Sequence, residues 1–491
     1  MTTQSLFING KWTPGQGPVL QSFNPANKQV IWEGATASQT DVEASCQSAQ
    51  QALQTWSALA FEERFKIVQN FSDLLNSHKD ELAELISKEN GKPFWEAKTE
   101  VGAMVGKAKL SEQAFKERCQ ISERDMGDKT SFTRYKPLGV VAVFGPFNFP
   151  GHLANGHIIP ALLAGNTVVF KPSELTPAVA EFTVQLWEKA GLPKGVLNLV
   201  QGNAETAKAL LNNKNLRGVF FTGSSRVGKI ISKELADRPK VLLALEMGGN
   251  NPLVIHNIKD IKAAAFLTVQ SAFITAGQRC TCARRLLVVK DGNTQNFLDQ
   301  LKKDTQSLKV SAYNENPEPF MGPVINAHAA TAVLKAQEEL IKKGAQEILP
   351  VRLLKEDSAF LSPGLIDITN ANDLPDEEIF GPLLQIKIVS SLDEAIQEAN
   401  NSKYGLAAGI ITPEKNAFEI FYNNVHAGLI NWNTQLTGAS SAAPFGGIGD
   451  SGNHRPSAYF AADYCSYPIA SLEAKKIEMP ETLPPGFGES S

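Results

Sequence analysis

Two cysteines, Cys280 and Cys282, stand one residue apart in "TAGQRCTCARR", a stretch that is otherwise small, polar or basic. Such a pair could bind a metal, form a disulfide or include a reactive thiol. A structural zinc site needs four ligands, and the nearest histidines in the sequence, His256 and His328, are distant. The pattern therefore predicts that no metal is bound here.

A disulfide across one intervening residue would be strained, and five cysteines scattered through 491 residues do not resemble a disulfide framework. A reactive thiolate is favoured by nearby cations, which Arg279 and Arg284 supply, and Gly277 allows close approach of the backbone. From the residues alone, two interpretations stay open: a nucleophile in this pair, or two buried structural thiols.

The segments before this pair alternate between strand and helix patterns. A helical region is predicted over 38–90, where apolar residues recur every three or four positions. Short apolar strands are then predicted in "VVAVF", "TVVF", "VLNLV", "GVFF" and "VLLALE", with helices over 177–190 and 204–212 and another after "GVFFTG". Because all-apolar strands are typical of sheets covered on both faces, the pattern predicts a doubly wound parallel sheet.

The alternation continues beyond residue 252 in a second unit. Strands are predicted in "NPLVIH", "RRLLVVK" and "LLQIKIV", and helices over 260–274, over 293–307 and in "LDEAIQEANNS". The polar stretch 119–136 is predicted to leave the first unit as a hairpin. The expected fold class is therefore α/β, with two doubly wound parallel-sheet domains.

The composition argues against two classes of partner. The chain has 47 basic and 51 acidic residues and a formal net charge of −4, so no global basic field would attract nucleic acid. Apolar runs fall short of the roughly 18 residues needed to cross a bilayer, and the N-terminus does not resemble a signal peptide. We therefore expect a cytoplasmic enzyme that acts on a small-molecule substrate, without a membrane or nucleic-acid partner.

Seven motifs together resemble the aldehyde dehydrogenase superfamily, in its order and over nearly the whole chain. They are "VFGPFNFP", "FKPSE", "FTGSSRVG", "LEMGGNNP", "GQRCTCA", "EEIFGPL" and "PFGGIGDSG". One departure is Asn250, where many members have lysine after the glycine pair. The resemblance implies an aldehyde dehydrogenase-like fold with a small oligomerisation hairpin added to the two domains.

The resemblance also implies a covalent mechanism. Cys280 would attack the aldehyde carbon as a thiolate, and the Asn148 amide and the Cys280 backbone N–H would stabilise the resulting oxyanion. Loss of hydride to NAD would leave a thioester. Glu246 would then act as the general base that activates water to cleave it.

The implied cofactor is NAD. In "FFTGSSRVG" a strand leads through a turn into a helix whose N-terminus can face a pyrophosphate. A carboxylate at Glu174 would bind free ribose hydroxyls but repel a 2′-phosphate, which favours NAD over NADP. The cofactor contacts carried over from the family are Lys171, Glu174, Gly223, Ser224, Ser225, Arg226, Val227, Gly228, Glu378 and Phe380.

The resemblance divides the chain into functional units. Residues 1–118 and 138–248 would form the NAD-binding domain, and residues 249–450 the catalytic domain. The segments 119–137 and 464–491 would be oligomerisation elements, which implies a homodimer or a dimer of dimers.

At a finer level, "FGPFNFPGHLANGHIIPALLAGN" and "NHRPSAYFAADYC" look like the branch of the family that oxidises N-succinylglutamate 5-semialdehyde in arginine breakdown, by the arginine succinyltransferase pathway. An acidic semialdehyde of this kind needs cations or donors in its pocket. Arg279, Ser440 and Ser441 are the candidates, although Arg279 could instead be solvated or ion-paired.

Other activities fit parts of the sequence. Glutamate or succinate semialdehyde are alternative substrates. A CoA-acylating semialdehyde dehydrogenase is less compatible, because such members generally lack a base at the position of Glu246. A cysteine hydrolase would have no use for "FTGSSRVG", and a catalytically silent oligomer would not need Cys280, Asn148 and Glu246 together.

Overall fold

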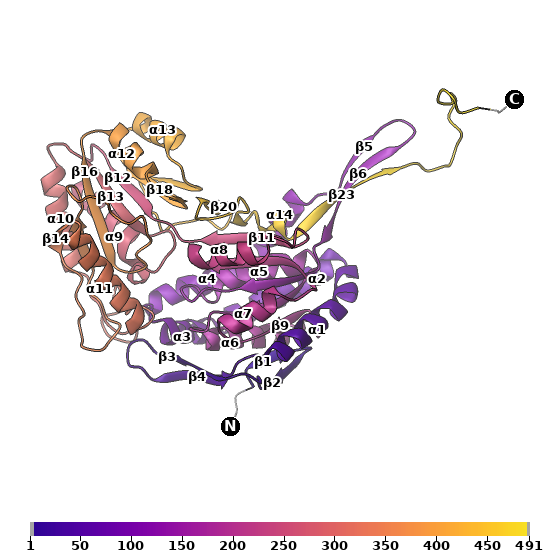
Figure 1. The fold of residues 1–491 in the computed structure, drawn as a ribbon, viewed down its shortest axis with the longest axis horizontal. Coiled ribbons are helices and arrows are strands. Elements are labelled where there is room, and N and C mark those ends of the chain that lie inside the picture. The colour runs from indigo at the N-terminus through magenta and orange to yellow at the C-terminus, as the bar shows by residue number, and fades with distance from the viewer. Residues whose placement is uncertain (1–3, 489–491) are drawn as a thin grey trace.

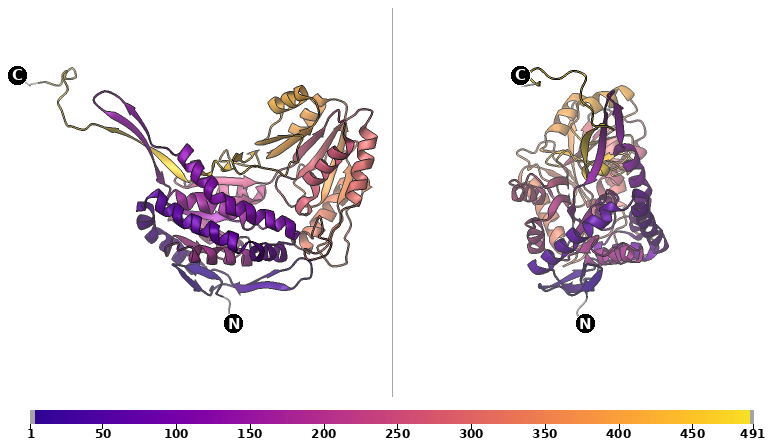
Figure 2. Two further views of the ribbon diagram at one scale, coloured as in Figure 1. Left: turned by 180° about the vertical axis from the view of Figure 1, so that it is seen from behind. Right: turned by 90° about the vertical axis from the view of Figure 1, so that its right-hand side faces the viewer.

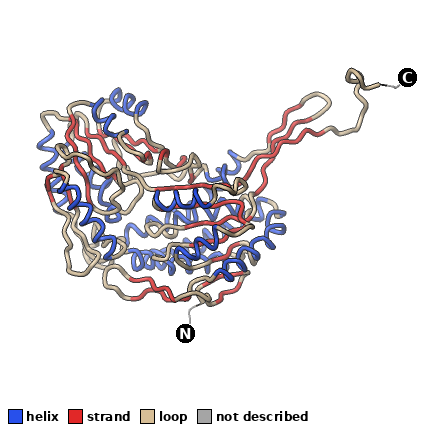
Figure 3. Tube along the Cα trace, in the orientation of Figure 1, coloured by secondary structure: helices blue, strands red, loops and turns tan. Residues whose placement is uncertain are grey.

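The computed structural model describes residues 4–488 and contains two seven-stranded sheets (Figures 1 and 3). Residues 1–3 and 489–491, the ends of the predicted NAD-binding and oligomerisation segments, lie outside the described residues. The strands of the first sheet fall within residues 6–247 and those of the second within residues 251–432. The predicted α/β class with two parallel-sheet units is confirmed.

The first sheet has the strand order β11-β10-β7-β8-β9-β1-β2, and its pairs from β11 to β9 are parallel. Its strands are β1 (Leu6–Ile8), β2 (Lys11–Thr13), β7 (Val140–Phe144), β8 (Thr167–Lys171), β9 (Leu197–Leu199), β10 (Leu216–Gly223) and β11 (Leu242–Met247). In β7, Val141 and Val143 enter one hydrophobic core and the alternate residues enter another on the opposite face. Both faces are covered, so the strand is apolar throughout.

Helices cover both faces of this sheet. One core contains residues of α2 (Phe61–Ser77), α3 (Lys79–Asn90), α4 (Phe94–Arg118), α5 (His152–Leu163) and α6 (Pro177–Lys189). The other contains residues of α1 (Gln39–Ala58), α7 (Ala204–Leu211) and α8 (Ser225–Glu234). The helical region predicted over 38–90 is therefore three helices, because the chain turns at residues 59–60 and at His78.

The second sheet has the order β14-β15-β16-β13-β12-β18-β19 and is parallel except for its edge strand β14. Its strands are β12 (Asn251–Ile255), β13 (Ala283–Val289), β14 (Gln346–Leu349), β15 (Gly364–Asp367), β16 (Leu383–Val389), β18 (Ala407–Ile411) and β19 (Leu429–Trp432). Two hydrophobic cores pack against this sheet. One contains residues of α9 (Ile261–Phe273), α10 (Thr294–Gln306) and α11 (Ala327–Lys342), and the second contains residues of α12 (Leu392–Asn400) and α13 (Lys415–Asn424).

A three-stranded antiparallel sheet extends away from the main body (Figure 1 and the left view of Figure 2). It joins β5 (Ser122–Asp125) and β6 (Thr130–Pro137) to β23 (Ser466–Glu473), which lies far along the chain. The hairpin predicted over 119–136 is therefore present. The shorter elements are β3 (Val19–Phe23), β4 (Val30–Ala35), β17 (Tyr404–Gly405), β20 (Pro444–Phe445), β21 (Ile448–Gly449), β22 (Ser457–Ala458), α14 (Ala461–Tyr464) and a 3₁₀ turn at Ile274–Gly277.

Candidate active site

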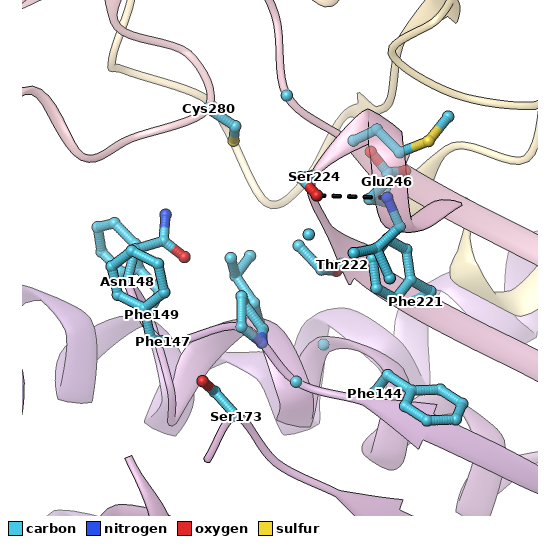
Figure 4. Close-up of a pocket in the computed structure, with 18 of the residues that line it drawn as sticks. Phe144, Phe147, Asn148, Phe149, Ser173, Phe221, Thr222, Ser224, Glu246 and Cys280 are labelled. Atoms are coloured by element: carbon cyan, nitrogen blue, oxygen red, sulfur yellow. Dashed lines mark hydrogen bonds between the residues drawn. The ribbon is translucent and has the colours of Figure 1, made fainter. Parts of the chain in front are cut away.

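A cleft of about 1150 Å³ lies between the first sheet and loops that follow residue 251. The residues that line it include the ends of β7, β8, β10 and β11, together with the loop that carries Cys280. The carboxyl ends of parallel strands meet at one edge of a sheet, which is where ligands of open α/β sheets bind. The topology thus brings the separate motifs of the sequence into one site (Figure 4).

The loop before Cys280 has an unusual backbone. Thr275, Ala276 and Gly277 all have positive φ, at 57°, 53° and 71°. A Cβ at Gly277 would lie 2.2 Å from the carbonyl oxygen of Gly381, so only glycine fits there. Left-handed conformations of other residues cost of order 1–3 kcal/mol each, and the surrounding structure must hold them in place.

Buried polar contacts hold this loop. The Glu96 carboxylate accepts hydrogen bonds from the backbone N–H and the hydroxyl of Thr275. Arg284, which is fully buried, donates to the carbonyl of Gly277 at 2.6 Å. The Asn251 amide donates to the carbonyl of Cys280 at 2.7 Å. These contacts fix the position of Cys280 before any ligand enters.

Cys280 lines the cleft, whereas Cys282 is fully buried and does not. Burial raises the pKa of the Cys280 thiol to about 12, and the Glu378 and Glu246 carboxylates add to the shift. Of the two arginines expected to favour a thiolate, Arg284 does lower the pKa of the Cys280 thiol, but burial and the two carboxylates outweigh it. Arg284 is the smallest of these causes, and its guanidinium also pairs with the Glu378 carboxylate at 3.3 Å.

The raised pKa predicts how the free enzyme reacts with iodoacetamide. Below the pKa, the thiolate fraction of Cys280 grows tenfold per pH unit, so its alkylation rate should rise about tenfold per unit from roughly pH 7 to pH 10, without a plateau. Peptide mass spectrometry at each pH measures the rate, and buried Cys282 should stay unmodified. A plateau below about pH 8 would contradict the assignment of the thiol as protonated.

Glu246 lies on β11 and lines the same cleft. Its Oε1 accepts a hydrogen bond from the Ser457 backbone N–H at 3.1 Å, and its buried Oε2 has no partner within residues 4–488. Burial raises the pKa of this carboxyl well above its usual value. A carboxylate with a free oxygen and a raised pKa is suited to accept a proton from water near neutral pH.

Asn148 is held so that part of its side chain stays available. Its Nδ2 donates to the backbone carbonyl of Gln278 at 3.0 Å, and its backbone carbonyl accepts a hydrogen bond from the Lys92 ammonium at 2.7 Å. The second N–H of the amide is then available to a ligand. The backbone N–H of Cys280 also makes no hydrogen bond to another residue in the described part of the chain. Together they can serve as oxyanion donors, and Figure 4 shows Asn148 and Cys280 facing the same space.

The cofactor residues carried over from the family divide into two groups. Lys171, Glu174, Gly223, Ser224, Arg226, Val227, Glu378 and Phe380 all line the cleft. Ser225 and Gly228 do not. A Cβ at Gly228 would lie 2.2 Å from the Met247 sulfur, so this glycine lets α8 pack closely against β11.

These residues fit a dinucleotide. Helix α8 begins at the cleft, and its N-cap Ser224 accepts a hydrogen bond from the Val227 N–H at 3.3 Å. Because Ser224 and Arg226 line the cleft, the N-terminus of this helix can face a pyrophosphate there. Glu174 is half exposed and lies just after β8, with its Oε2 3.7 Å from the Nζ of Lys171. This carboxylate and this ammonium can bind sugar hydroxyls. Glu378 is held by Arg284 at 3.3 Å.

The candidate substrate residues also line the cleft, but Arg279 is already paired. Its guanidinium bonds the buried Glu96 carboxylate at 2.5 Å and the Thr275 hydroxyl at 2.8 Å. Arg279 therefore stabilises the loop that carries Cys280, which agrees with the alternative that this arginine is ion-paired. Ser440 and Ser441 lie beside the cleft in a loop, partly or fully exposed.

Several lining residues were not predicted from the sequence. Phe147 and Phe149 flank Asn148, and Lys107 and His152 come from α4 and α5. A lysine among small and apolar residues in "GAMVGKAKL" was the available signal for Lys107, but helix α4 itself was not predicted. Within residues 4–488, no cluster of three or more His, Cys, Asp or Glu side chains is arranged to hold a metal ion.

Among residues 4–488, no helix is both long enough and apolar enough to cross a membrane.

The family follows from the comparison with known proteins. Residues 12–468 match the model of the aldehyde dehydrogenase family, and the chain belongs to this family. The resemblance seen in the seven motifs is therefore confirmed.

Individual relatives are similar over almost their full length. The chain is 51% identical over 482 residues to an N-succinylglutamate 5-semialdehyde dehydrogenase of Burkholderia multivorans, covering 98% of this chain and 99% of that protein. A putative methylmalonate-semialdehyde dehydrogenase of Sinorhizobium meliloti, crystallised with NAD, matches with a TM-score of 0.92 and 26% identity over 98% of this chain and 99% of that one. A betaine aldehyde dehydrogenase variant of Staphylococcus aureus, crystallised with NAD⁺, has a TM-score of 0.91 at 27% identity, covering 97% of each chain.

Proposed function

We propose that this protein oxidises N-succinylglutamate 5-semialdehyde to N-succinylglutamate with NAD, by covalent catalysis at Cys280. The observation that carries the proposal is the convergence of Cys280, Asn148 and Glu246 on one cleft. The 51% identical relative named for this substrate supports the choice of aldehyde.

Cys280 begins the reaction by forming a bond from sulfur to the aldehyde carbon. The thiol must lose its proton to solvent as it attacks, since burial raises its pKa to about 12. The carbonyl oxygen becomes an oxyanion, which the free N–H of Asn148 and the backbone N–H of Cys280 stabilise.

NAD, when bound, supplies the acceptor for the hydride that leaves the former aldehyde carbon. We propose that the α8 N-terminus with Gly223, Ser224, Arg226 and Val227 binds its pyrophosphate, with Ser225 and Gly228 shaping the turn behind them. Lys171 and Glu174 would hold the adenosine ribose, and Glu378 and Phe380 the nicotinamide half.

Glu246 completes the cycle at the thioester on Cys280. Its unpartnered Oε2 can accept a proton from water as the water oxygen attacks the thioester carbon. The carbon–sulfur bond then breaks, the carboxylate product leaves, and Cys280 takes up a proton. The base is thus needed after hydride transfer.

A spectrophotometric screen tests the proposed substrate. With NAD, we expect kcat/KM for N-succinylglutamate 5-semialdehyde to exceed that for glutamate semialdehyde, succinate semialdehyde and pentanal by at least about tenfold, because an acidic substrate gains charge-assisted contacts. NADP should react less well, since Glu174 would repel its 2′-phosphate. An increase in rate that requires coenzyme A would instead favour the acylating alternative.

We also propose that residues 1–118 with 138–248, and residues 249–450, act as the NAD-binding and catalytic domains. The sheet of β5, β6 and β23 would carry contacts between subunits, within the predicted segments 119–137 and 464–491, in a homodimer or dimer of dimers. Its projection from the body supports this role. The five free cysteines are consistent with action in the cytoplasm.

A further inference from the structure

Lys107 is a buried cation that has no counterion. It lies on α4, is 3% exposed and lines the cleft. The other buried cations near the site are paired: Lys92 with Glu100 at 2.6 Å, and Arg279 and Arg284 with the carboxylates described above. Within residues 4–488, Lys107 has neither a hydrogen-bond acceptor nor an ion-pair partner, and burial lowers its pKa to about 8.

The groups around Lys107 do not neutralise it. His152 and His157 on α5 also line the cleft, and their pKa values fall to about 3 because of burial and then the Lys107 charge, so both imidazoles are neutral. His157 uses both ring nitrogens, on the Tyr464 hydroxyl at 2.8 Å and the Thr222 hydroxyl at 3.1 Å. The buried Nδ1 of His152 has no partner in the described part of the chain.

An unpaired buried ammonium is costly, and such groups are ordinarily paired or neutralised. Here the open side of Lys107 is the cleft, and an unpartnered imidazole nitrogen lies in the same wall. A carboxylate that enters the cleft would supply the missing counterion to the ammonium and could accept a further hydrogen bond from a neutral His152 tautomer that carries its proton on Nδ1.

We propose that Lys107, with His152 beside it, binds a carboxylate of the substrate remote from the aldehyde carbon and thereby selects acidic semialdehydes. This inference rests on the proposed function and specifies how its substrate is recognised. Arg279 is less suited to the same task because Glu96 already shares its charge.

The test compares Lys107→Met, which keeps the length of the side chain without its charge, with Lys109→Met as a matched control. Lys109 lies two residues further along α4 and is exposed. We expect Lys107→Met to lower kcat/KM for N-succinylglutamate 5-semialdehyde by about 10- to 100-fold, mainly through KM, as for loss of a charge-assisted hydrogen bond. For pentanal, which has no carboxylate, kcat/KM should be unchanged or higher. Lys109→Met should match the wild type with both aldehydes.

A binding measurement gives a readout that does not depend on turnover. By calorimetry, N-succinylglutamate should bind Lys107→Met about 10- to 100-fold more weakly than the wild type, whereas Lys109→Met should bind it equally well. Because the substitution removes an unpaired buried charge, the melting temperature of Lys107→Met should not fall, which separates recognition from a structural role.

The outcomes distinguish this inference from the proposed function. Equal losses for the acidic aldehyde and pentanal, or unchanged binding of N-succinylglutamate by Lys107→Met, would overturn the role of Lys107 and leave the proposed function intact. A wild-type protein that oxidises neither aldehyde would overturn the proposed function. In that case calorimetry still decides the inference: absent or equal binding refutes it, and selective loss in Lys107→Met supports it.

Discussion

Replacing Cys280 with alanine is expected to lower NAD-dependent turnover by about 10⁴-fold or more, because no sulfur remains to form the covalent bond on which hydride release depends. The substitution should leave cofactor binding intact, since the α8 N-terminus and the ends of β8 and β10 are separate from the thiol. NADH absorbance measures turnover, and NAD binding by calorimetry measures the integrity of the cleft.

Cys282→Ala is the matched control for this experiment. Cys282 lies two residues away and is fully buried, with its sulfur turned toward the Ile274 carbonyl and away from the cleft. It should keep turnover within about tenfold of the wild type, with a modest loss of stability from the small cavity left behind. If Cys280→Ala retained wild-type turnover while Cys282→Ala abolished it, the nucleophile would have been assigned to the wrong sulfur.

The fold was largely predictable because its parallel strands are buried on both faces. "VVAVF" is apolar along its whole length and became β7, and "NPLVI" is apolar after its first residue and became β12. The helices expected over 177–190 and 260–274 match α6 and α9 to within a residue at each end. Helix α5 was not predicted: Pro160 interrupts its pattern, and such a residue normally ends a helix.

The site was predictable where it depends on strand ends and was not where it depends on contacts between distant segments. Glu246 and Gly223 follow apolar strands in the sequence, so their place at the sheet edge could be expected. The pairing of Arg279 with Glu96 joins a loop to helix α4, 183 residues apart, and periodicity gives no sign of it. The direction of the Cys280 pKa shift is set mainly by burial among such segments, which outweighs the nearby Arg284 and has no sign in the local sequence.

Glu246→Gln is expected to separate the two halves of the reaction. Glutamine has the same shape and can still accept the hydrogen bond from the Ser457 N–H, so the cleft should be preserved. Without a base, the thioester on Cys280 should accumulate. Stopped-flow absorbance should then show a burst of about one NADH per site, followed by steady turnover slower by roughly 10²- to 10⁴-fold. Mass spectrometry of the quenched protein should detect the acyl group on the Cys280 peptide.

The pH profile supplies the second part of this test. Glu246 must be ionised to accept a proton, and burial raises its pKa well above the ordinary value. Steady turnover of the wild type should therefore increase as pH rises toward and through neutrality, and Glu246→Gln should lack this limb. A variant that keeps the wild-type steady rate would refute the role of Glu246 as base. Loss of the burst together with turnover would instead place its essential action at deprotonation of Cys280, before hydride transfer.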